Sequence, residues 1–325
     1  MKLAKLLERL EYEVIQGTKE IDIAKVVNHS KDAEYGSLFV CITGMLTDGC
    51  AYIGDAVSRG AVAVMTERDV NIPREITVIR VENTRKALAK IAAAFYGYPS
   101  EELITIGVTG TKGKTTTTCM IRDILEQAGH KAGLIGTIEV QTGKRSIPSE
   151  HTSPESVVIQ KYLREMVEAG CDTVVMEVSS QGLKLHRVDE ILFDIGVFMN
   201  LGEDHIGKYE HADFEEYKCC KAQLFRQCRL GIFNMDSPYW KDMLKTAECR
   251  KETFGFQKKA DYILANPQLI NTKNALGISY SINETPVRLS MPGEFNVYNS
   301  AAAFIVCKHL GVSLKSMQST LKRVQ

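Results

Sequence analysis

The chain has 325 residues, with 40 lysines and arginines against 40 aspartates and glutamates, so its formal net charge is zero. This balance gives no long-range field that would favour nucleic acid or an anionic membrane surface, and we expect neither as a partner. No stretch is long and apolar enough for a membrane span, and residues 1–17 lack the uninterrupted apolar region of a signal peptide. We expect a monomeric cytoplasmic protein of two or three domains that binds small molecules.

Residues 1–98 alternate helical and strand patterns and carry no strong catalytic motif. The expected helices and strands are 3–10, 37–43, 52–60, 61–67, 76–82 and 84–97. Gly97, Pro99 and Ser100 then interrupt the pattern. We therefore expect a first domain at 1–98 and a second at 99–325.

The second domain begins with an apolar strand at 103–109, a loop, and a helix at 114–128. Strands and helices continue to alternate up to about residue 255, which favours a mostly parallel sheet covered on both faces. Period-two alternation at 260–292 predicts antiparallel hairpins, and a helix is expected from about Asn296. The expected fold is α/β: a small N-terminal α/β domain, then a mostly parallel-sheet P-loop domain with a short antiparallel β region.

The loop between that strand and helix has the composition of a phosphate-binding loop. Gly110 and Gly113 allow close backbone approach, Lys114 supplies a cation, and Thr115 supplies a hydroxyl for Mg²⁺. The backbone N–H groups and the helix dipole both favour an anion at such a junction. The commonest form of this loop has a further glycine where Val108 stands. The alternative is a structural glycine-rich turn with an exposed lysine. The strand before the loop and the helix after it favour a binding site for a nucleoside triphosphate.

Glu177 lies in the otherwise apolar strand pattern VVMEVSS. An unpaired buried carboxylate would cost several kcal/mol, so it needs a cation. In a nucleotide site that cation is Mg²⁺, which prefers oxygen ligands. The alternative is a structural ion pair with a lysine such as Lys184.

Two further residues are candidates for the same site. His205 lies in the polar loop NLGEDHIGKYEH, where a lone histidine is usually just exposed. Lys221 shares a helix side with Phe214, Tyr217 and Leu224, so it should point toward the core. Lysine is seldom buried without a partner, and Lys218 on the same helix competes for any special role.

The order of these segments resembles the Mur ligase family of peptidoglycan precursor synthesis. The segments that carry the resemblance are TGTKGKTT, HTSPES, MEVSSQGL with a later His-Arg pair, NLGEDHIG, CCKAQLF and GEFNVYN. It runs from about residue 25 to the end and is most similar to the members that add a diamino acid to UDP-N-acetylmuramoyl-L-alanyl-D-glutamate. The combination is far more specific than any one motif.

The resemblance implies a role for each matching position. The implied ATP contacts are Gly110, Thr111, Lys112, Gly113, Lys114, Thr115, Thr116 and Asn299. The implied catalytic groups are Lys114, Glu177, His205 and Lys221, and the implied ligands of two Mg²⁺ ions are Thr115, Glu177, His205 and Lys221. In this family the lysine that Lys221 matches is carbamylated by carbon dioxide, which turns a cation into an anion. Mechanistically, the γ-phosphoryl group of ATP would activate a substrate carboxylate as an acyl phosphate, which an amine then attacks.

On the substrate side, the resemblance implies that Ser30 contacts the UDP group and that the muramoyl dipeptide contacts Thr152, Ser153, Ser179 and Arg187. Hydroxyls suit sugar and pyrophosphate oxygens, and arginine offers a planar fork to a carboxylate or phosphate.

Several positions depart from the family pattern, namely Lys31, Lys112, Gln181 and Gly202-Glu203. The extra cation of Lys112 could strengthen ATP binding or crowd it. The family also has a third, C-terminal domain for the added amino acid, which we expect to be absent from this chain.

Three hypotheses follow. The first is a diamino acid ligase lacking its C-terminal domain. The second is a protein or fragment that binds ATP and a UDP-sugar without full ligase activity, against which the joint presence of Glu177, His205 and Lys221 counts. The third is another ligase of the same superfamily, such as a folylpolyglutamate synthase, against which Ser30, the HTSPES segment and the N-terminal domain count.

Overall fold

The computed structural model describes residues 1–44, 47–204, 206–207, 210–272 and 275–324, and its contacts divide the chain into two compact units. The first unit comprises Met1–Pro99, Glu155–Arg164 and Leu185–Glu190. The second comprises Ser100–Pro154, Glu165–Lys184 and Ile191–Gln325. The expected division of roles between a domain at 1–98 and a domain at 99–325 stays a prediction.

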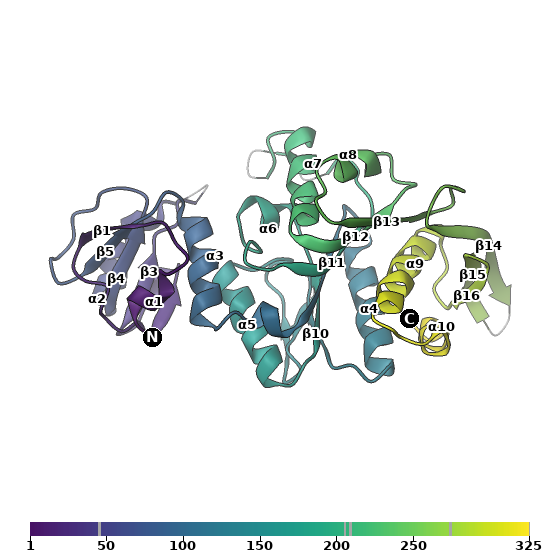
Figure 1. The fold of residues 1–325 in the computed structure, drawn as a ribbon, viewed down its shortest axis with the longest axis horizontal. Helices are drawn as coiled ribbons and strands as arrows, with labels where there is room; N and C mark the ends of the chain where they lie inside the picture. Colours follow the sequence, from purple (N-terminus) through teal and green to yellow (C-terminus); the bar gives the residue numbers. More distant parts are fainter. Residues whose placement is uncertain (45–46, 205, 208–209, 273–274, 325) are drawn as a thin grey trace. The chain divides into compact units, whose positions relative to one another are not determined.

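The first unit is built on a five-stranded sheet in the order β1-β5-β4-β3-β2 (Figure 1). Strands β2 to β5 are mutually parallel where they pair, and β1 is antiparallel to β5. The strands are β1 (Glu13–Gln16), β2 (Lys25–Val27), β3 (Ser37–Val40), β4 (Ala61–Thr66) and β5 (Thr77–Arg80). The helices are α1 (Leu3–Leu6), η1 (Ser30–Asp32), η2 (Gly49–Tyr52), α2 (Ile53–Ser58) and α3 (Thr84–Phe95).

Helix α3 shows why this unit folds as its sequence indicates. Asn83 caps it, since its side chain accepts hydrogen bonds from the backbone N–H groups of Arg85 and Lys86. Leu88 and Ile91 are buried on the face that packs into the core. The helix expected at 3–10 is wrong in length: α1 ends at Leu6, because residues 7–9 form a turn that still places Leu7 and Leu10 against the core without a further helical turn.

The second unit contains the remaining elements. Its strands are β6 (Ile104–Thr109), β7 (Ala132–Ile135), β8 (Glu139–Gln141), β9 (Ser146–Pro148), β10 (Thr173–Glu177), β11 (Phe193–Phe198), β12 (Cys228–Asn234), β13 (Arg250–Gly255), β14 (Tyr262–Thr272), β15 (Ala275–Ile282) and β16 (Thr285–Leu289). Its helices are α4 (Lys114–Gln127), α6 (Ser180–Lys184), α7 (Phe214–Ala222), η4 (Gln223–Arg226), α8 (Trp240–Lys245), α9 (Glu294–His309) and α10 (Leu314–Leu321). Two elements contribute residues to both units, η3 (Pro99–Glu102) and α5 (Ser156–Glu168).

These strands form one sheet in the order β16-β15-β14-β13-β12-β11-β6-β10-β7-β8-β9. The strands from β14 to β7 in this order are parallel, and antiparallel strands extend both ends of the sheet. The mixed α/β fold with a mostly parallel sheet is therefore confirmed, as is the antiparallel region at 260–292. The β8–β9 hairpin and β13 were not expected, because their short segments are polar and lack a clear alternation.

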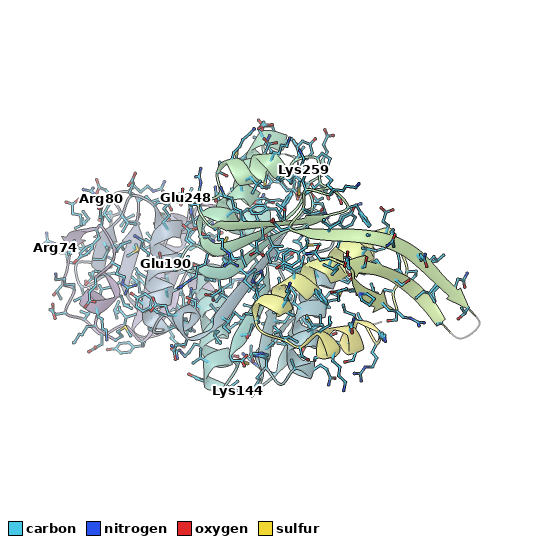
Figure 2. The ribbon with its side chains drawn as sticks, turned by 45° about the vertical axis from the view of Figure 1, so that its right-hand side comes forward. Arg74, Arg80, Lys144, Glu190, Glu248 and Lys259 are labelled. Carbon is cyan, nitrogen blue, oxygen red and sulfur yellow. The ribbon has the colours of Figure 1, made fainter. Side chains whose placement is uncertain are left out.

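Strand β6 lies in the middle of this sheet, between β10 and β11. Helix α4, which follows it, buries Met120, Ile121, Ile124 and Leu125 in the core that α9 also lines. Helices α9 and α10 cover the antiparallel strands β14 to β16, as Figures 1 and 2 both show. Because parallel strands end at the same edge, the segments after β6, β10, β11 and β12 are brought together there. Within the described residues, no helix combines the length and hydropathy needed to cross a membrane.

Candidate functional site

The turn from β6 into α4 forms the centre of the site. Gly113 caps α4 with φ of +84°, a conformation that side chains other than glycine rarely adopt. A Cβ atom added there would lie 2.4 Å from Oδ1 of Asn299, and one added at Gly110 would lie 2.9 Å from Cβ of Met199. Both glycines are therefore required by close contacts as well as by the turn. The N-terminus of α4 offers its unpaired N–H groups at this point.

The segment after the neighbouring strand β11 holds the loop in shape. The backbone N–H of Thr111 donates to the carbonyl of Asn200 at 3.0 Å, and that of Lys112 donates to Oδ1 of Asn200 at 2.9 Å. Nδ2 of Asn200 in turn donates to the carbonyl of Lys112 at 3.0 Å. The hydroxyl groups of Thr111 and Tyr217 are 3.0 Å apart, which connects the loop to α7. The loop is thus fixed before any ligand binds.

Two lysines converge on one carbonyl oxygen of this loop. Nζ of Lys114 donates to the carbonyl of Gly110 at 2.9 Å, and Nζ of Lys221 donates to the same oxygen at 3.0 Å. Lys221 is only 1% exposed, so the expectation that it points inward from α7 is confirmed. Burial lowers the pKa of both side chains, and the charge of Lys114 lowers the pKa of Lys221 further, to well below 10.5. Such a site favours an anion, or a chemical change that removes one positive charge.

Lys218, the competing lysine on α7, has a different environment. Its Nζ lies 2.8 Å from Oε1 of Glu215 and 3.6 Å from Oδ2 of Asp242. The hydrogen bond with Glu215 raises the pKa of Lys218, so it stays a protonated cation. The structure therefore separates the two lysines: only Lys221 reaches the loop.

Glu177, at the end of β10, is 1% exposed. Its Oε1 accepts from the backbone N–H of Thr137 at 2.8 Å, and its Oε2 accepts from the Thr137 hydroxyl at 3.0 Å. The register of the sheet places Glu177 opposite Val108 of β6, two residues before Gly110. The charge of Glu177 raises the pKa of Lys114, opposing the larger effect of burial, which lowers it. The alternative partner Lys184 is wrong, because its Nζ pairs with Glu216 at 2.9 Å.

Three of the expected substrate residues gather beside Glu177. The hydroxyl of Ser153 donates to the Glu177 carbonyl at 3.2 Å and lies 3.1 Å from the hydroxyl of Ser179. The hydroxyl of Thr152 lies 3.0 Å from that of Thr137, which itself bonds to the Glu177 carboxylate. The structure thus joins the segments after β7 and β10 in one hydroxyl-lined network.

A cavity of about 710 Å³ opens next to the phosphate loop. Lys112, Gly113 and Thr116 line one end of it, and Asn299, at 3% exposure, lines its wall. Oδ1 of Asn299 lies 3.4 Å from the hydroxyl of Thr117, and its Nδ2 donates to Oδ1 of Asn296 at 3.1 Å. The expected nucleotide residue Asn299 is therefore part of the same cavity as the loop.

The other expected substrate residues lie in the first unit. Ser30 is 4% exposed and hydrogen-bonds to Asp55, which lowers the pKa of that carboxyl group. It lines a cavity of about 640 Å³ that also has Arg85 and Glu155 in its wall. Nη2 of Arg187 donates to Oε1 of Glu155 at 2.6 Å. Ser30 and Arg187 are thus each placed within this unit, Arg187 through an ion pair with a cavity residue.

The structure describes one of the two remaining expected metal ligands, Thr115, and not the other, His205. Thr115 lies in the first turn of α4 and is half-buried, whereas His205 falls outside the described residues. In the part of the chain that the structure describes, no group of three or more His, Cys, Asp or Glu side chains is arranged to hold a metal.

Sequence reasoning missed several residues of the site. Thr137 follows β7, and Asp236 and Ser237 follow β12. The signal that could have found them is a polar residue shortly after the end of each of these two parallel strands.

Comparisons with known proteins agree with this geometry. A sequence profile described as the Mur ligase middle domain matches residues 108–307. A second one, described as the catalytic domain of the Mur ligase family, matches residues 22–96. The chain belongs to the Mur ligase family. The resemblance inferred from the motifs is confirmed.

Individual members of the family match along the whole chain. The UDP-N-acetylmuramoyl-L-alanyl-D-glutamate–2,6-diaminopimelate ligase of Caldanaerobacter subterraneus subsp. tengcongensis is 41% identical over 330 residues, which cover 100% of this chain and 67% of the relative. The ligase of the same name from Clostridium tetani is 38% identical over 327 residues, with the same coverage. A solved structure with that ligase name has a TM-score of 0.84 at 22% identity, covering 100% of this chain and 67% of the other, and it confirms the fold. These relatives are ligases, in agreement with the expected enzyme class.

Proposed function

We propose that this chain is the UDP-sugar-binding and ATP-binding part of a ligase that joins a diamino acid to UDP-N-acetylmuramoyl-L-alanyl-D-glutamate in peptidoglycan precursor synthesis. The observation that carries the proposal is the convergence of Lys114 and Lys221 on the Gly110 carbonyl, at the edge of the sheet where the strand of the buried Glu177 also ends. The names of the relatives at 38–41% identity supply the substrate class. A cytoplasmic location and a monomeric state belong to the same proposal.

The phosphate loop would hold the triphosphate of ATP. The N–H groups at the start of α4 and the ammonium of Lys114 face the small volume where the phosphates would lie. To do so, Lys114 would exchange its hydrogen bonds to the carbonyls of Gly110 and Thr111 for phosphate oxygens. The nucleoside would extend into the cavity lined by Thr116 and Asn299.

Magnesium fits part of this donor set. The Thr115 hydroxyl and the Glu177 carboxylate are the hard oxygen ligands that Mg²⁺ prefers, and Glu177 is buried without a lysine or arginine in hydrogen-bond contact among the described residues. Lys221 fits only in a changed form, because an ammonium group repels a metal cation. A bound Mg²⁺ would neutralise charge on the transferring phosphoryl group. The second metal position, with His205 as a ligand, is part of this proposal.

Carbamylation of Lys221 would make the donor set complete. Carbon dioxide reacts with a neutral amine, and the buried position of Lys221 beside Lys114 favours the neutral form by lowering its pKa. The product is an N-carboxylate: the nitrogen forms a bond to the carbon of CO₂ and releases one proton. This change replaces the repulsion between two cations by the attraction of an anion to Lys114 and to magnesium.

The substrate would be held by hydroxyls and by one arginine. Ser30 and the first-unit cavity would bind the UDP group, and Thr152, Ser153, Ser179 and Arg187 would bind the muramoyl dipeptide. The reaction would then take two steps. A carboxylate oxygen of the dipeptide attacks the γ-phosphorus and ADP leaves; the amine of the diamino acid attacks the acyl carbon, a C–N bond forms, and phosphate leaves while the nitrogen loses a proton. No protein nucleophile is needed, because the protein acts by positioning the reactants and by stabilising the charge of the transferring phosphoryl group.

Calorimetric titration tests this proposal against its alternatives. UDP-N-acetylmuramoyl-L-alanyl-D-glutamate should bind the chain, folate should not displace it, and Ser30→Ala should weaken it. Displacement by folate would favour a folate ligase instead. Full affinity of the wild-type chain for both ATP and the UDP-dipeptide, unchanged in Lys221→Ala and without any magnesium-dependent phosphoryl transfer, would favour a binding protein.

A further inference from the structure

The residues that follow β3 in the first unit pair with one another in an antiparallel arrangement. Two backbone hydrogen bonds and one bridge define the pairs, which are Ile42 with Gly49 (3.0 Å), Thr43 with Asp48, and Gly44 with Thr47 (2.9 Å). We call these six residues the β3 hairpin. Cys41 directly precedes the hairpin and Cys50 directly follows it, so the chain brings the two cysteines together at its open end.

The contacts of the two side chains agree with this placement. Cys41 continues the pairing of β3 with β4, because its backbone N–H donates to the carbonyl of Met65 at 2.8 Å, and the next residue of β4 is Thr66. Sγ of Cys50 lies 3.6 Å from Oγ1 of the same Thr66. Cys41 belongs to a buried core cluster, and Cys50 packs against that cluster. Burial raises the pKa of the Cys41 thiol, and the charge of Cys50 and a hydrogen bond between the two side chains raise it further. The two thiols therefore face each other.

The two thiols differ in their access to solvent. Cys41 is 1% exposed, whereas Cys50 is half-exposed. A dissolved reagent therefore reaches Cys50 first, and Cys41 can then react with the sulfur beside it. Among the residues that the structure describes, no group of three or more His, Cys, Asp or Glu side chains is arranged to hold a metal. The pair thus suits thiol–disulfide exchange rather than metal binding.

The β3 hairpin forms part of the wall of the first-unit cavity, which has a volume of about 640 Å³ and which Ser30 also lines. The hairpin residues that line the cavity are Ile42, Gly44, Thr47 and Gly49. Cys41 and Cys50 do not line it. A covalent bond between the two cysteines would therefore join the two sides of the hairpin and leave the cavity open to its ligand.

We propose that Cys41 and Cys50 form a reversible disulfide that fixes the wall of the first-unit cavity; its effect on the ligand rests on the UDP site proposed above. The oxidant is a low-molecular-weight disulfide. The Cys50 thiolate attacks one sulfur of this oxidant, the S–S bond of the oxidant breaks, and a small thiolate leaves with the electron pair. Cys41 then loses its proton to solvent and attacks the Cys50 sulfur, and the second small thiolate leaves. Both cysteines are oxidised and the oxidant is reduced to two thiols, a change that a reducing compartment reverses.

Peptide mapping by mass spectrometry tests the bond itself. Trypsin leaves residues 32–59 as one peptide, since no lysine or arginine lies between Lys31 and Arg59, and Cys41 and Cys50 are its only cysteines. The folded chain is treated with oxidised glutathione and then alkylated under denaturing conditions. This peptide should then carry no alkyl group and be lighter by two hydrogen atoms, and dithiothreitol should restore both alkylation sites. In Cys50→Ala and in Cys41→Ala, no peptide with the internal bond should appear.

Calorimetry with UDP-N-acetylmuramoyl-L-alanyl-D-glutamate tests the effect on the cavity. The oxidised chain should bind this ligand about twofold to tenfold more tightly than the reduced chain, because the wall no longer has to be ordered on binding. The affinity of Cys50→Ala should equal that of the reduced wild type, with or without the oxidant. Cys249→Ala is the matched control, since Cys249 is half-exposed like Cys50 but belongs to the second unit, and it should keep the wild-type response.

The outcomes separate this inference from the proposed function. If the ligand binds but the peptide 32–59 keeps two free thiols after oxidation, the disulfide is wrong and the UDP site stands. If the disulfide forms and the affinity is unchanged or lower, the bond does not fix the wall and the inference fails. A response that is lost in Cys249→Ala would assign the relevant oxidation to the second unit and would also overturn it. If neither redox state binds the ligand, the UDP site and the effect on it fail together.

Discussion

The two glycines at the ends of α4 allow the geometry of the phosphate loop to be tested with an internal control. Gly113 precedes the helix with φ of +84°, and Gly129 follows it with φ of +96°. A Cβ at Gly113 would lie 2.4 Å from Oδ1 of Asn299, whereas one at Gly129 would have nothing within 4 Å. The two alanine variants thus share the backbone strain, and only Gly113→Ala adds a collision.

The expected losses in the free energy of unfolding follow from these contacts. The left-handed conformation costs an alanine roughly 1–2 kcal/mol, and this is the whole effect expected for Gly129→Ala. In Gly113→Ala, Asn299 must also move and weaken its hydrogen bonds to Thr117 and Asn296, each worth about 0.5–1.5 kcal/mol. We therefore expect Gly113→Ala to have a free energy of unfolding about 1–3 kcal/mol lower than that of Gly129→Ala, which corresponds to a Tm lower by about 2–4 °C per kcal/mol.

Denaturant titration of both variants measures the difference in stability, and calorimetry with MgATP measures its consequence for binding. Gly113→Ala should weaken ATP binding, because both the loop and Asn299 are displaced. Gly129→Ala should bind ATP as the wild type does. Equal stability losses together with equal ATP affinities would refute the argument that Gly113 is required by its contact with Asn299.

Three further predictions concern the charged residues. Lys114→Ala should raise the dissociation constant of ATP by about 10- to 150-fold, which corresponds to the loss of one or two charge-assisted hydrogen bonds. The dissociation constant of the UDP-dipeptide should stay nearly unchanged. Equal losses of affinity for both ligands in calorimetry would contradict separate sites. Lys221→Ala should abolish magnesium-dependent phosphoryl transfer, and an excess of a short-chain carboxylate should restore part of it. An inactive Lys218→Ala together with an active Lys221→Ala would show that the wrong lysine was chosen. Burial lowers the folded-state pKa of Lys221 below 10.5, so between that lowered pKa and 10.5 the unfolded chain binds more protons and the free energy of unfolding rises with pH. Lys221→Met should flatten this rise in CO₂-free denaturant titrations at several pH values, and an unchanged slope would show that Lys221 is not the group responsible.

The fold was predictable where periodicity and length agree. The strand, loop and helix at 103–128 appear as β6 and α4 with boundaries shifted by one residue, because the apolar spacing and the glycines act locally. The β8–β9 hairpin and β13 were missed, since each is held in place by a neighbouring strand rather than by its own pattern. Helix α1 was expected to be longer, because the leucine spacing does not distinguish a continued helix from the turn that also brings Leu7 and Leu10 to the core.

The site was predictable only in part, for a related reason. Lys221 could be placed from its helical spacing, and the structure adds what spacing cannot show, namely that it shares the Gly110 carbonyl with Lys114. The role of Thr137 beside Glu177 depends on two strands that are adjacent in space and 40 residues apart along the chain. Pairings of this kind become visible only once the strand order is known. The roles of the individual residues in catalysis remain predictions.

The central claim is that the loop at Gly110–Thr116, Glu177 and a carbamylated Lys221 together form a metal-dependent phosphoryl-transfer site. Its most direct test is a crystal structure of the chain grown with bicarbonate, Mn²⁺ in place of Mg²⁺ and a non-hydrolysable ATP analogue, in which anomalous scattering locates the metal. The account predicts triphosphate on the loop, manganese bound by Thr115 and by Glu177, and extra density for a carboxylate on Nζ of Lys221. A triphosphate bound elsewhere, or manganese absent from Glu177 together with a bare amine at Lys221, would contradict it.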